Sequence, residues 1–204
     1  MNSAKLILLS LFFVLCFLFC SRSNRSTEIT LVSFDQFDSE KLEFVELVFR
    51  EKFKFDTLII IQNELPSEAF YKPGSRYRAD KLIHYLKENY ETDKVIGLTN
   101  KDISTTLGKH EDWGIMGLAY RPGKSCVVST FRTFRGAKSE DHKNERLKKV
   151  VFHEFGHTLG LPHCKSSKSC LMRDANGKVI TVDETDDFCT NCKNKIEPYL
   201  RHPN

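Results

Sequence analysis

Apolar residues recur along most of the chain at spacings that alternate between those of strands and those of helices. Apolar positions three and four residues apart predict helices, whereas short apolar runs bounded by turn residues predict strands. The run at 57–61 is rich in β-branched residues and predicts a buried strand. The alternation predicts an α/β (α+β) fold, followed from Gly160 onward by a tail rich in turn residues. The predicted strands are 29–33, 57–61 and 94–98, and the predicted helices are 40–52, 79–90 and 145–159.

A hairpin is predicted between the last two helices. Residues 116–120 and 126–134 are strand-like, and a turn around Arg121-Pro122-Gly123-Lys124 separates them. A charged loop over 135–144 leads into the last predicted helix.

The N-terminus carries an apolar run of a different kind. Lys5 precedes a run from Leu6 to Cys20 that is apolar except for Ser10. As a helix this run spans about 22 Å, short of a hydrocarbon core of about 30 Å, and it therefore predicts a secretory signal. Two alternatives are a lipoprotein acylated at Cys20, although Phe19 is bulky for such a cleavage site, and an uncleaved membrane anchor.

These patterns divide the chain into three parts: an export segment (1–20, a signal peptide or a lipoprotein or membrane anchor), a linker (21–28) and a single domain (29–204). The protein is therefore predicted to be exported, and to be either secreted or anchored to a membrane. Its net charge of +4 is small and spread along the chain, which argues against a nucleic-acid partner. We expect the domain to act as a monomer.

A cluster of histidines on the last predicted helix points to a metal site. His153 and His157 are four residues apart, so their imidazoles lie on the same side of a helix and can bind one cation. A catalytic zinc usually has three protein ligands and a water. Gly160 permits a left-handed turn at the helix end and Pro162 discourages further helix, so the chain can return His163 to the same ion.

Glu154, between the two helical histidines, is the candidate general base. It is too close to both in sequence to be a convenient ligand, but it can accept the proton of a zinc-bound water that attacks a carbonyl. One alternative is a chance pair of surface histidines. The other is a non-catalytic zinc site, which would explain the histidines and leave Glu154 unexplained.

Four cysteines in the tail form a second candidate metal site. Cys164 directly follows the third histidine, Cys170 comes next, and Cys189 and Cys192 form a C-x-x-C pair. Four thiolates from separate stretches suit a closed tetrahedral zinc site, which would help a tail with few apolar residues to fold. The alternative is two disulfides, which an exported protein permits. Cys126 lies in an apolar strand and is assigned to the core.

Residues 153–192 resemble the archaemetzincin signature, HExxHxxGxxHC followed by Cys-x-Met and then C-x-x-C. The resemblance implies a metzincin-like zincin fold: a twisted mixed sheet, an active-site helix and a small zinc-stapled C-terminal part. It implies two Zn²⁺ ions, one catalytic and one structural. The catalytic ligands would be His153, His157 and His163, with Glu154 as base, and the structural ligands Cys164, Cys170, Cys189 and Cys192.

The same resemblance assigns two further parts of the site. Met172 would form the Met-turn, an apolar floor beneath the catalytic ligands. The strand 126–134 would be the sheet edge that pairs with an extended substrate, the alternative being an internal strand. The gap between Cys164 and Cys170 holds five residues where the family has about four, a loop difference that leaves the ligands in place.

The sequence therefore predicts a zinc metallopeptidase that acts on peptide or protein substrates. The alternative from another class is a non-catalytic zinc-binding interaction module that keeps the metzincin scaffold.

Overall fold

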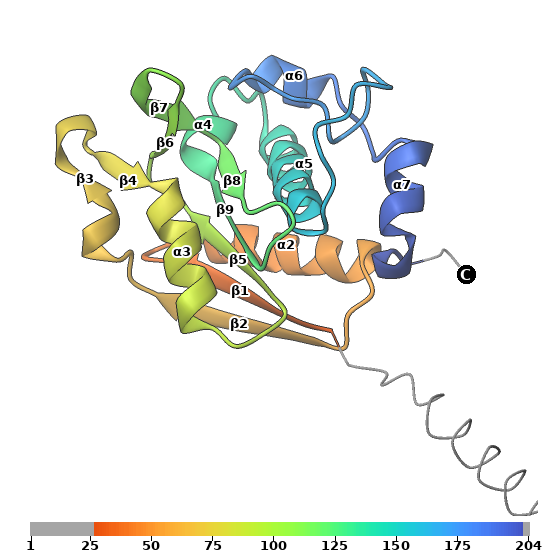
Figure 1. Ribbon diagram of the computed structural model, residues 1–204, viewed down its shortest axis with the longest axis horizontal. Helices are drawn as coiled ribbons and strands as arrows, with labels where there is room; N and C mark the ends of the chain where they lie inside the picture. Colours follow the sequence, from red (N-terminus) through yellow and green to blue (C-terminus); the bar gives the residue numbers. More distant parts are fainter. Residues whose placement is uncertain (1–26, 202–204) are drawn as a thin grey trace, which may run out of the picture.

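The computed structural model describes residues 27–201 (Figure 1). The predicted export segment, and the linker up to residue 26, lie outside the described residues. Within 27–201, no helix is both long enough and apolar enough to cross a membrane.

A five-stranded sheet forms the centre of the domain. Its strand order is β2 (Thr57–Asn63), β1 (Glu28–Phe34), β5 (Lys94–Thr99), β9 (Ser125–Ser129) and β8 (Gly117–Ala119). The first four strands are parallel, and β8 pairs antiparallel with β9 at one edge. The predicted mixed sheet is therefore confirmed, as is the hairpin that joins β8 to β9.

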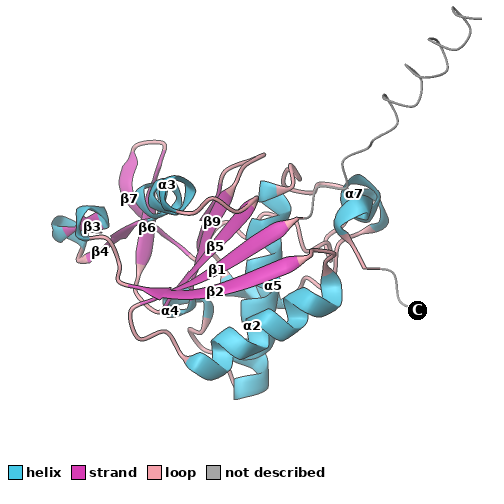
Figure 2. Cartoon of the chain, turned by 90° about the horizontal axis from the view of Figure 1, so that it is seen from below, coloured by secondary structure: helices cyan, strands magenta, loops and turns pink. Residues whose placement is uncertain are grey.

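Helices cover both faces of this sheet. The helices α2 (Ser39–Lys52) and α5 (Glu140–Thr158) lie on one face, and α3 (Ala79–Asn89) lies on the other (Figure 2). Alternate side chains of strand β1 enter the hydrophobic cores on the two faces of the sheet. Leu31 points into the core beneath α2 and α5, whereas Val32 points into the core beneath α3.

Two predictions about the strands were wrong. The stretch 126–134 is not an edge strand, because β9 lies between β5 and β8 and the chain then turns into the helix α4 (Thr130–Thr133). The edge on that side is β8. The run 57–61 is not a buried strand either, since β2 is the opposite edge and Ile60 is 41% exposed.

A smaller sheet, which the sequence pattern did not predict, stands beside β8. Its order is β3 (Phe70–Tyr71), β4 (Arg76–Arg78), β6 (Ile103–Leu107) and β7 (His110–Ile115). The tight turn between β6 and β7 uses Gly108 at a φ of 57°, a left-handed conformation that glycine adopts at low cost. The remaining short elements are η1 (Ser67–Ala69), η2 (Lys72–Gly74), α6 (Val179–Asp183), α7 (Thr190–Ile196) and η3 (Glu197–Tyr199).

Helix α5 begins five residues before its predicted start. Ser139 caps it by accepting a hydrogen bond from the His142 backbone N–H at 3.1 Å, and Glu140 and Asp141 occupy the first turn. Four phenylalanines fix α5 against α2 through tilted and edge-to-face ring contacts with centroids 4.8–5.6 Å apart. These are Phe49, Phe53, Phe152 and Phe155.

Candidate metal centres and active-site cleft

The three predicted histidines meet at the C-terminal half of α5. One ring nitrogen from each of His153, His157 and His163 lies within 4.8 Å of the others. His153 Nε2 and His157 Nε2 are 3.1 Å apart. Nitrogens bound at about 2.1 Å to a tetrahedral zinc lie about 3.4 Å apart, so this spacing is close to that of a zinc site.

The other ring nitrogens of the two helical histidines fix their orientation. His153 Nδ1 donates to the Leu171 carbonyl at 2.8 Å, and His157 Nδ1 donates to the Leu161 carbonyl at 2.6 Å. A carbonyl can only accept, so each Nδ1 carries the proton and each Nε2 presents a lone pair to the other. Two lone pairs that face each other at this distance suit a shared cation.

Burial keeps both helical histidines neutral. Desolvation, followed by the charge of His157, lowers the pKa of His153 to about 3. Desolvation also lowers the pKa of His157 to about 4. Because imidazole binds metals in its neutral form, both side chains are ready to act as ligands at neutral pH.

The turn after α5 brings His163 to the other two. Gly160 has a φ of 97°, as the sequence predicts for a left-handed helix end. Lys94, from β5, holds this end in place by donating from Nζ to the Thr158 carbonyl at 2.8 Å and to the Gly123 carbonyl at 2.6 Å. His163 Nδ1 lies 3.4 Å from an Asp174 carboxylate oxygen, which can orient the ring.

Glu154 is buried on the same helix and faces the edge strand. Its residue surface is 8% exposed, and desolvation raises the pKa of its carboxyl to about 8 in the metal-free chain. Gly117 of β8 leaves room for it, because a Cβ at that position would lie 2.6 Å from Glu154 Cγ. A nearby cation would favour the carboxylate, so metal binding and ionisation of Glu154 support each other.

A cleft of about 760 Å³ brings the site residues together. Its walls come from α5, from β8, from the β6–β7 hairpin and from the segment between Leu171 and Thr185. The three histidines and Glu154 line it, together with apolar side chains such as Trp113 and Val150. An apolar cleft with a few convergent polar groups is the usual form of a binding site.

The four tail cysteines form the second cluster that the sequence predicted. Their sulfurs lie within 4.8 Å of one another, with Cys164 Sγ to Cys189 Sγ and Cys170 Sγ to Cys192 Sγ both at 3.7 Å. Sulfurs at about 2.3 Å from a tetrahedral zinc lie about 3.8 Å apart, whereas a disulfide requires about 2.05 Å. All five cysteines in residues 27–201 are free thiols, and Cys126 is buried in the core as predicted.

The two clusters are joined through Met172. This side chain is fully buried, and the Cys164 N–H donates to the Met172 carbonyl at 2.8 Å. A Cβ on Gly156 of α5 would lie 2.7 Å from Met172 Sδ, so the glycine lets helix and methionine approach closely. Met172 therefore lies beneath the helix that carries His153 and His157, where the resemblance placed it.

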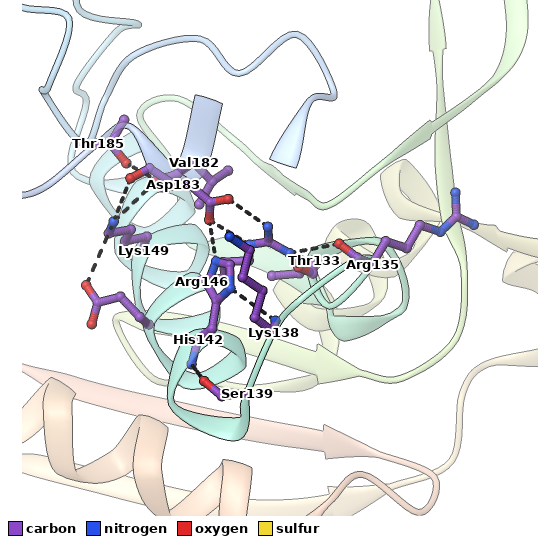
Figure 3. A network of polar contacts seen from close by, with 11 residues as sticks. Thr133, Arg135, Lys138, Ser139, His142, Arg146, Lys149, Val182, Asp183 and Thr185 are labelled. Carbon is purple, nitrogen blue, oxygen red and sulfur yellow. Dashed lines mark hydrogen bonds and ion pairs between the residues drawn. The ribbon is translucent and has the colours of Figure 1, made fainter. Parts of the chain in front are cut away.

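A polar network around α5 and α6 was not anticipated from the sequence. Buried Arg146 donates from Nε and Nη2 to the two Asp183 carboxylate oxygens, both at 2.7 Å, and His142 Nε2 lies 2.8 Å from the same carboxylate (Figure 3). Lys149 lies one turn further along α5 (Figure 3) and is one of the residues that line the cleft. The sequence could have indicated that Lys149 lies near the histidine site, because it precedes His153 by four residues and residues four apart share a helix face.

Comparisons with known proteins agree on one family. The model described as Peptidase family M54 matches residues 19–198. The archaemetzincin of Nanoarchaeum equitans is 34% identical over 157 residues, which are 76% of this chain and 79% of that protein. The crystal structure of archaemetzincin from Methanopyrus kandleri superposes with a TM-score of 0.72 at 28% identity, covering 87% of this chain and 97% of that one. That of archaemetzincin from Archaeoglobus fulgidus, complexed with malonate, gives 0.70 at 25% identity, covering 83% and 100%.

Proposed function

The chain belongs to peptidase family M54, the archaemetzincin family of zinc metallopeptidases, and from this premise we propose that it hydrolyses peptide bonds with Glu154 as general base. One observation carries the proposal. The buried carboxyl group of Glu154 lines the same cleft, beside a sheet edge, as three histidines whose ring nitrogens lie within 4.8 Å of one another. Its substrates are peptides or proteins.

Two zinc ions are proposed, one for each cluster. The open site would use His153, His157 and His163, and the closed site would use Cys164, Cys170, Cys189 and Cys192. When bound at the histidines, zinc supplies Lewis acidity and lowers the pKa of water toward about 7. The neutral imidazoles and the spacing of both donor sets support this assignment.

The proton transfers are assigned to Glu154. Its carboxylate takes a proton from the attacking water and then gives that proton to the leaving amine, so that one group acts as base and then as acid. Burial supports this double role, because it brings the pKa of Glu154 to about 8 in the metal-free chain and a cation draws it down again. The apolar lining of the cleft limits competing water.

The substrate would bind alongside β8. In the described part of the chain this strand pairs only with β9, on one side, so its other edge offers backbone N–H and C=O groups to an extended peptide. The strand proposed to pair with the substrate is therefore β8 (Gly117–Ala119), and not the stretch 126–134. Contact between Gly117 and Glu154 places this edge next to the proposed base.

The test is to compare the chain with its Glu154→Ala and Glu154→Gln variants, using a mixed peptide library and elemental analysis of zinc. We expect both variants to keep two zinc ions per chain and to lose hydrolysis by a factor of at least about 10². Hydrolysis that survives either change would refute the mechanism. If the unaltered, zinc-replete chain cleaves no peptide, the interaction module becomes the better description.

We also propose that the protein is exported, on the basis of the apolar run from Leu6 to Cys20. Fractionation of cells that express the full chain tests this. Metabolic labelling with a fatty acid, lost on Cys20→Ser, would identify a lipoprotein. A full-length, unlabelled chain in the membrane would identify an anchor, and recovery of the chain in the cytoplasm would contradict export.

A further inference from the structure

Lys149 is a buried cation at one end of the cleft. Its side chain is 10% exposed, and it lines the cleft together with Val150 of α5 and Val182 of α6. Figure 3 shows Lys149 reaching toward the backbone of α6. In sequence it lies four residues before His153, so the two side chains occupy the same face of α5, one turn apart. A peptide bound at the histidines extends both toward its N-terminus and toward its C-terminus, and one of these two parts therefore comes within reach of the Lys149 ammonium.

The contacts of the Lys149 ammonium are long. Nζ lies 3.4 Å from the Val182 carbonyl, 3.5 Å from the Asp183 carbonyl and 4.0 Å from a Glu145 carboxylate oxygen. The Val182 carbonyl already accepts a hydrogen bond from the Thr185 hydroxyl at 2.8 Å. Normal hydrogen bonds from nitrogen to oxygen measure about 2.7–3.2 Å, so these contacts satisfy the ammonium only weakly.

Two acidic residues that Lys149 contacts, Glu145 and Asp183, have carboxylates that are held by other cations. Asp183 accepts from Arg146 with both oxygens at 2.7 Å, and Glu145 pairs with Lys148 at 2.6 Å. Buried charges in proteins normally have a counter-ion, because desolvation without one is costly. Within residues 27–201, Lys149 is thus a cation in the cleft wall without a carboxylate of its own at hydrogen-bonding distance.

We propose that Lys149 selects substrates with an acidic side chain at the residue that follows the scissile bond. This inference rests on the proposed peptidase function. A glutamate or aspartate side chain that enters this end of the cleft would supply the missing counter-ion and form a charge-assisted hydrogen bond. Apolar neighbours such as Val150 and Val182 exclude water and strengthen that bond.

The course of β8 gives the direction of the substrate. Gly117, at the start of β8, lies against Glu154, and Gly123, beyond its end, donates to the Thr158 carbonyl at 3.1 Å. The strand therefore runs alongside α5 from Glu154 toward Thr158. A peptide that pairs antiparallel with β8, the more stable pairing, runs the opposite way. The residues after its scissile bond then approach Lys149.

The test uses pairs of peptides that differ only by Glu or Gln after the scissile bond. For the unaltered chain we expect kcat/KM to be at least about tenfold higher for the Glu peptide, the range of a hydrogen bond to a charged group. Lys149→Met should bring the ratio near one, mainly by lowering kcat/KM for the Glu peptide. Lys149→Arg, which keeps the charge, should keep the preference.

Lys143→Met is the matched control, because Lys143 lies on the same helix and pairs with Glu140 at 2.6 Å, so its removal leaves Glu145 paired with Lys148. It should keep the preference for the Glu peptide. Equal turnover of both peptides by the unaltered chain, or a preference that survives Lys149→Met, would overturn the proposal. A Lys149-dependent preference for an acidic residue before the scissile bond would overturn the assigned direction.

A binding measurement separates this proposal from the proposed function. Affinities of the two peptides are measured for the zinc-loaded Glu154→Gln chain, with and without Lys149→Met. Tighter binding of the Glu peptide that requires Lys149 supports the selectivity even if no peptide is cleaved, in which case only the peptidase function fails. Equal affinities refute the role of Lys149.

Discussion

The histidine site and the cysteine cluster are adjacent in sequence, where His163 is followed by Cys164, but the chain builds them differently. Two of the three histidines sit on α5, a 19-residue helix whose phenylalanines pack against α2. The cysteines sit on loops and at the start of α7, a helix of 7 residues. The first site is positioned by a helix that would form without metal, and the second lies in a tail of turns and short helices.

For the two proposed zinc ions, this difference predicts different roles. Backbone carbonyls at Leu161 and Leu171 orient His157 and His153 without help from a cation. The cysteine cluster has a weaker frame: two backbone hydrogen bonds, from Leu171 N–H to the Asp187 carbonyl at 3.0 Å and from Asp186 N–H to the Ser169 carbonyl at 2.9 Å, join its two stretches beside the sulfur contacts of 3.7 Å. Zinc should therefore complete the first site but hold the second together.

The largest expected effect comes from removing one cysteine ligand. Cys192→Ser should release one zinc and cost about 5 kcal/mol of unfolding free energy, or about 10 °C in Tm, because structural zinc supplies folding energy directly. His157→Ala should also release one zinc, but it should leave the tail folded. Elemental analysis, thermal unfolding and limited proteolysis beyond Gly160 check the contrast.

Cys126→Ala is the control, since Cys126 is buried in the core and outside the cluster. It should keep both zinc ions. If His157→Ala exposes the tail to protease as strongly as Cys192→Ser does, the two sites do not differ in the way proposed.

A smaller effect is expected at Asp183, which fastens the tail to α5 without any metal. Asp183→Asn removes the charge partner of Arg146, whose side chain is 5% exposed, and should cost about 3 kcal/mol, the lower range for breaking a buried pair. Glu184→Gln is the matched control. Its pair with Arg173 is exposed, so that change should cost less than about 1 kcal/mol. Chemical denaturation measures both, and equal losses would contradict the prediction.

The Asp183 pair also predicts a dependence on pH. Hydrogen bonds from Arg146 lower the pKa of Asp183 from 3.8 to about 2. The unfolded chain therefore takes up this proton at a higher pH than the folded chain. The stability from the pair is fully present above pH 3.8 and is lost as the pH falls toward 2. Asp183→Asn should remove this part of the acid sensitivity, and an unchanged acid profile would show that the pair is unimportant.

Much of the fold could be predicted from local patterns. The alternation of strands and helices located β1, α2, α3 and β5 because each has one buried face of regular period. The same reasoning could not place β2 at an edge, since a run such as 57–61 shows its β-branched residues but not its neighbours in the sheet. It also missed the smaller sheet, whose strands are short.

The candidate sites were partly predictable for a similar reason. The histidine and cysteine sets follow local spacing rules, and their donor atoms do come together. Lys149 and the Arg146–Asp183 pair depend on how α6 returns to α5, and Gly117 matters because a strand distant in sequence meets Glu154. Long-range packing of this kind leaves no periodic signal.

Gly156 marks the contact between the two regions. Gly156→Ala would place a Cβ 2.7 Å from Met172 Sδ and 3.2 Å from Phe188 Cε1, and we expect a loss of about 2 kcal/mol from overpacking. In a double-mutant cycle with Met172→Ala, the combined loss should be smaller than the sum of the single losses. Additive losses, measured by chemical denaturation, would mean that residue 156 and residue 172 are not energetically coupled.

Gly117 gives the smallest effect on stability and tests the histidine site alone. A Cβ there would lie 2.6 Å from Glu154 Cγ and 2.8 Å from its Oε1, and this flexible side chain can move aside at little cost in folding. The movement displaces the carboxylate from the proposed attacking water. Gly117→Ala should therefore lower kcat/KM about tenfold, or about 1.4 kcal/mol, while Tm and zinc content stay unchanged. Full activity would show that the position of Glu154 tolerates this shift, whereas loss of zinc would show that the strand edge also supports the metal ligands.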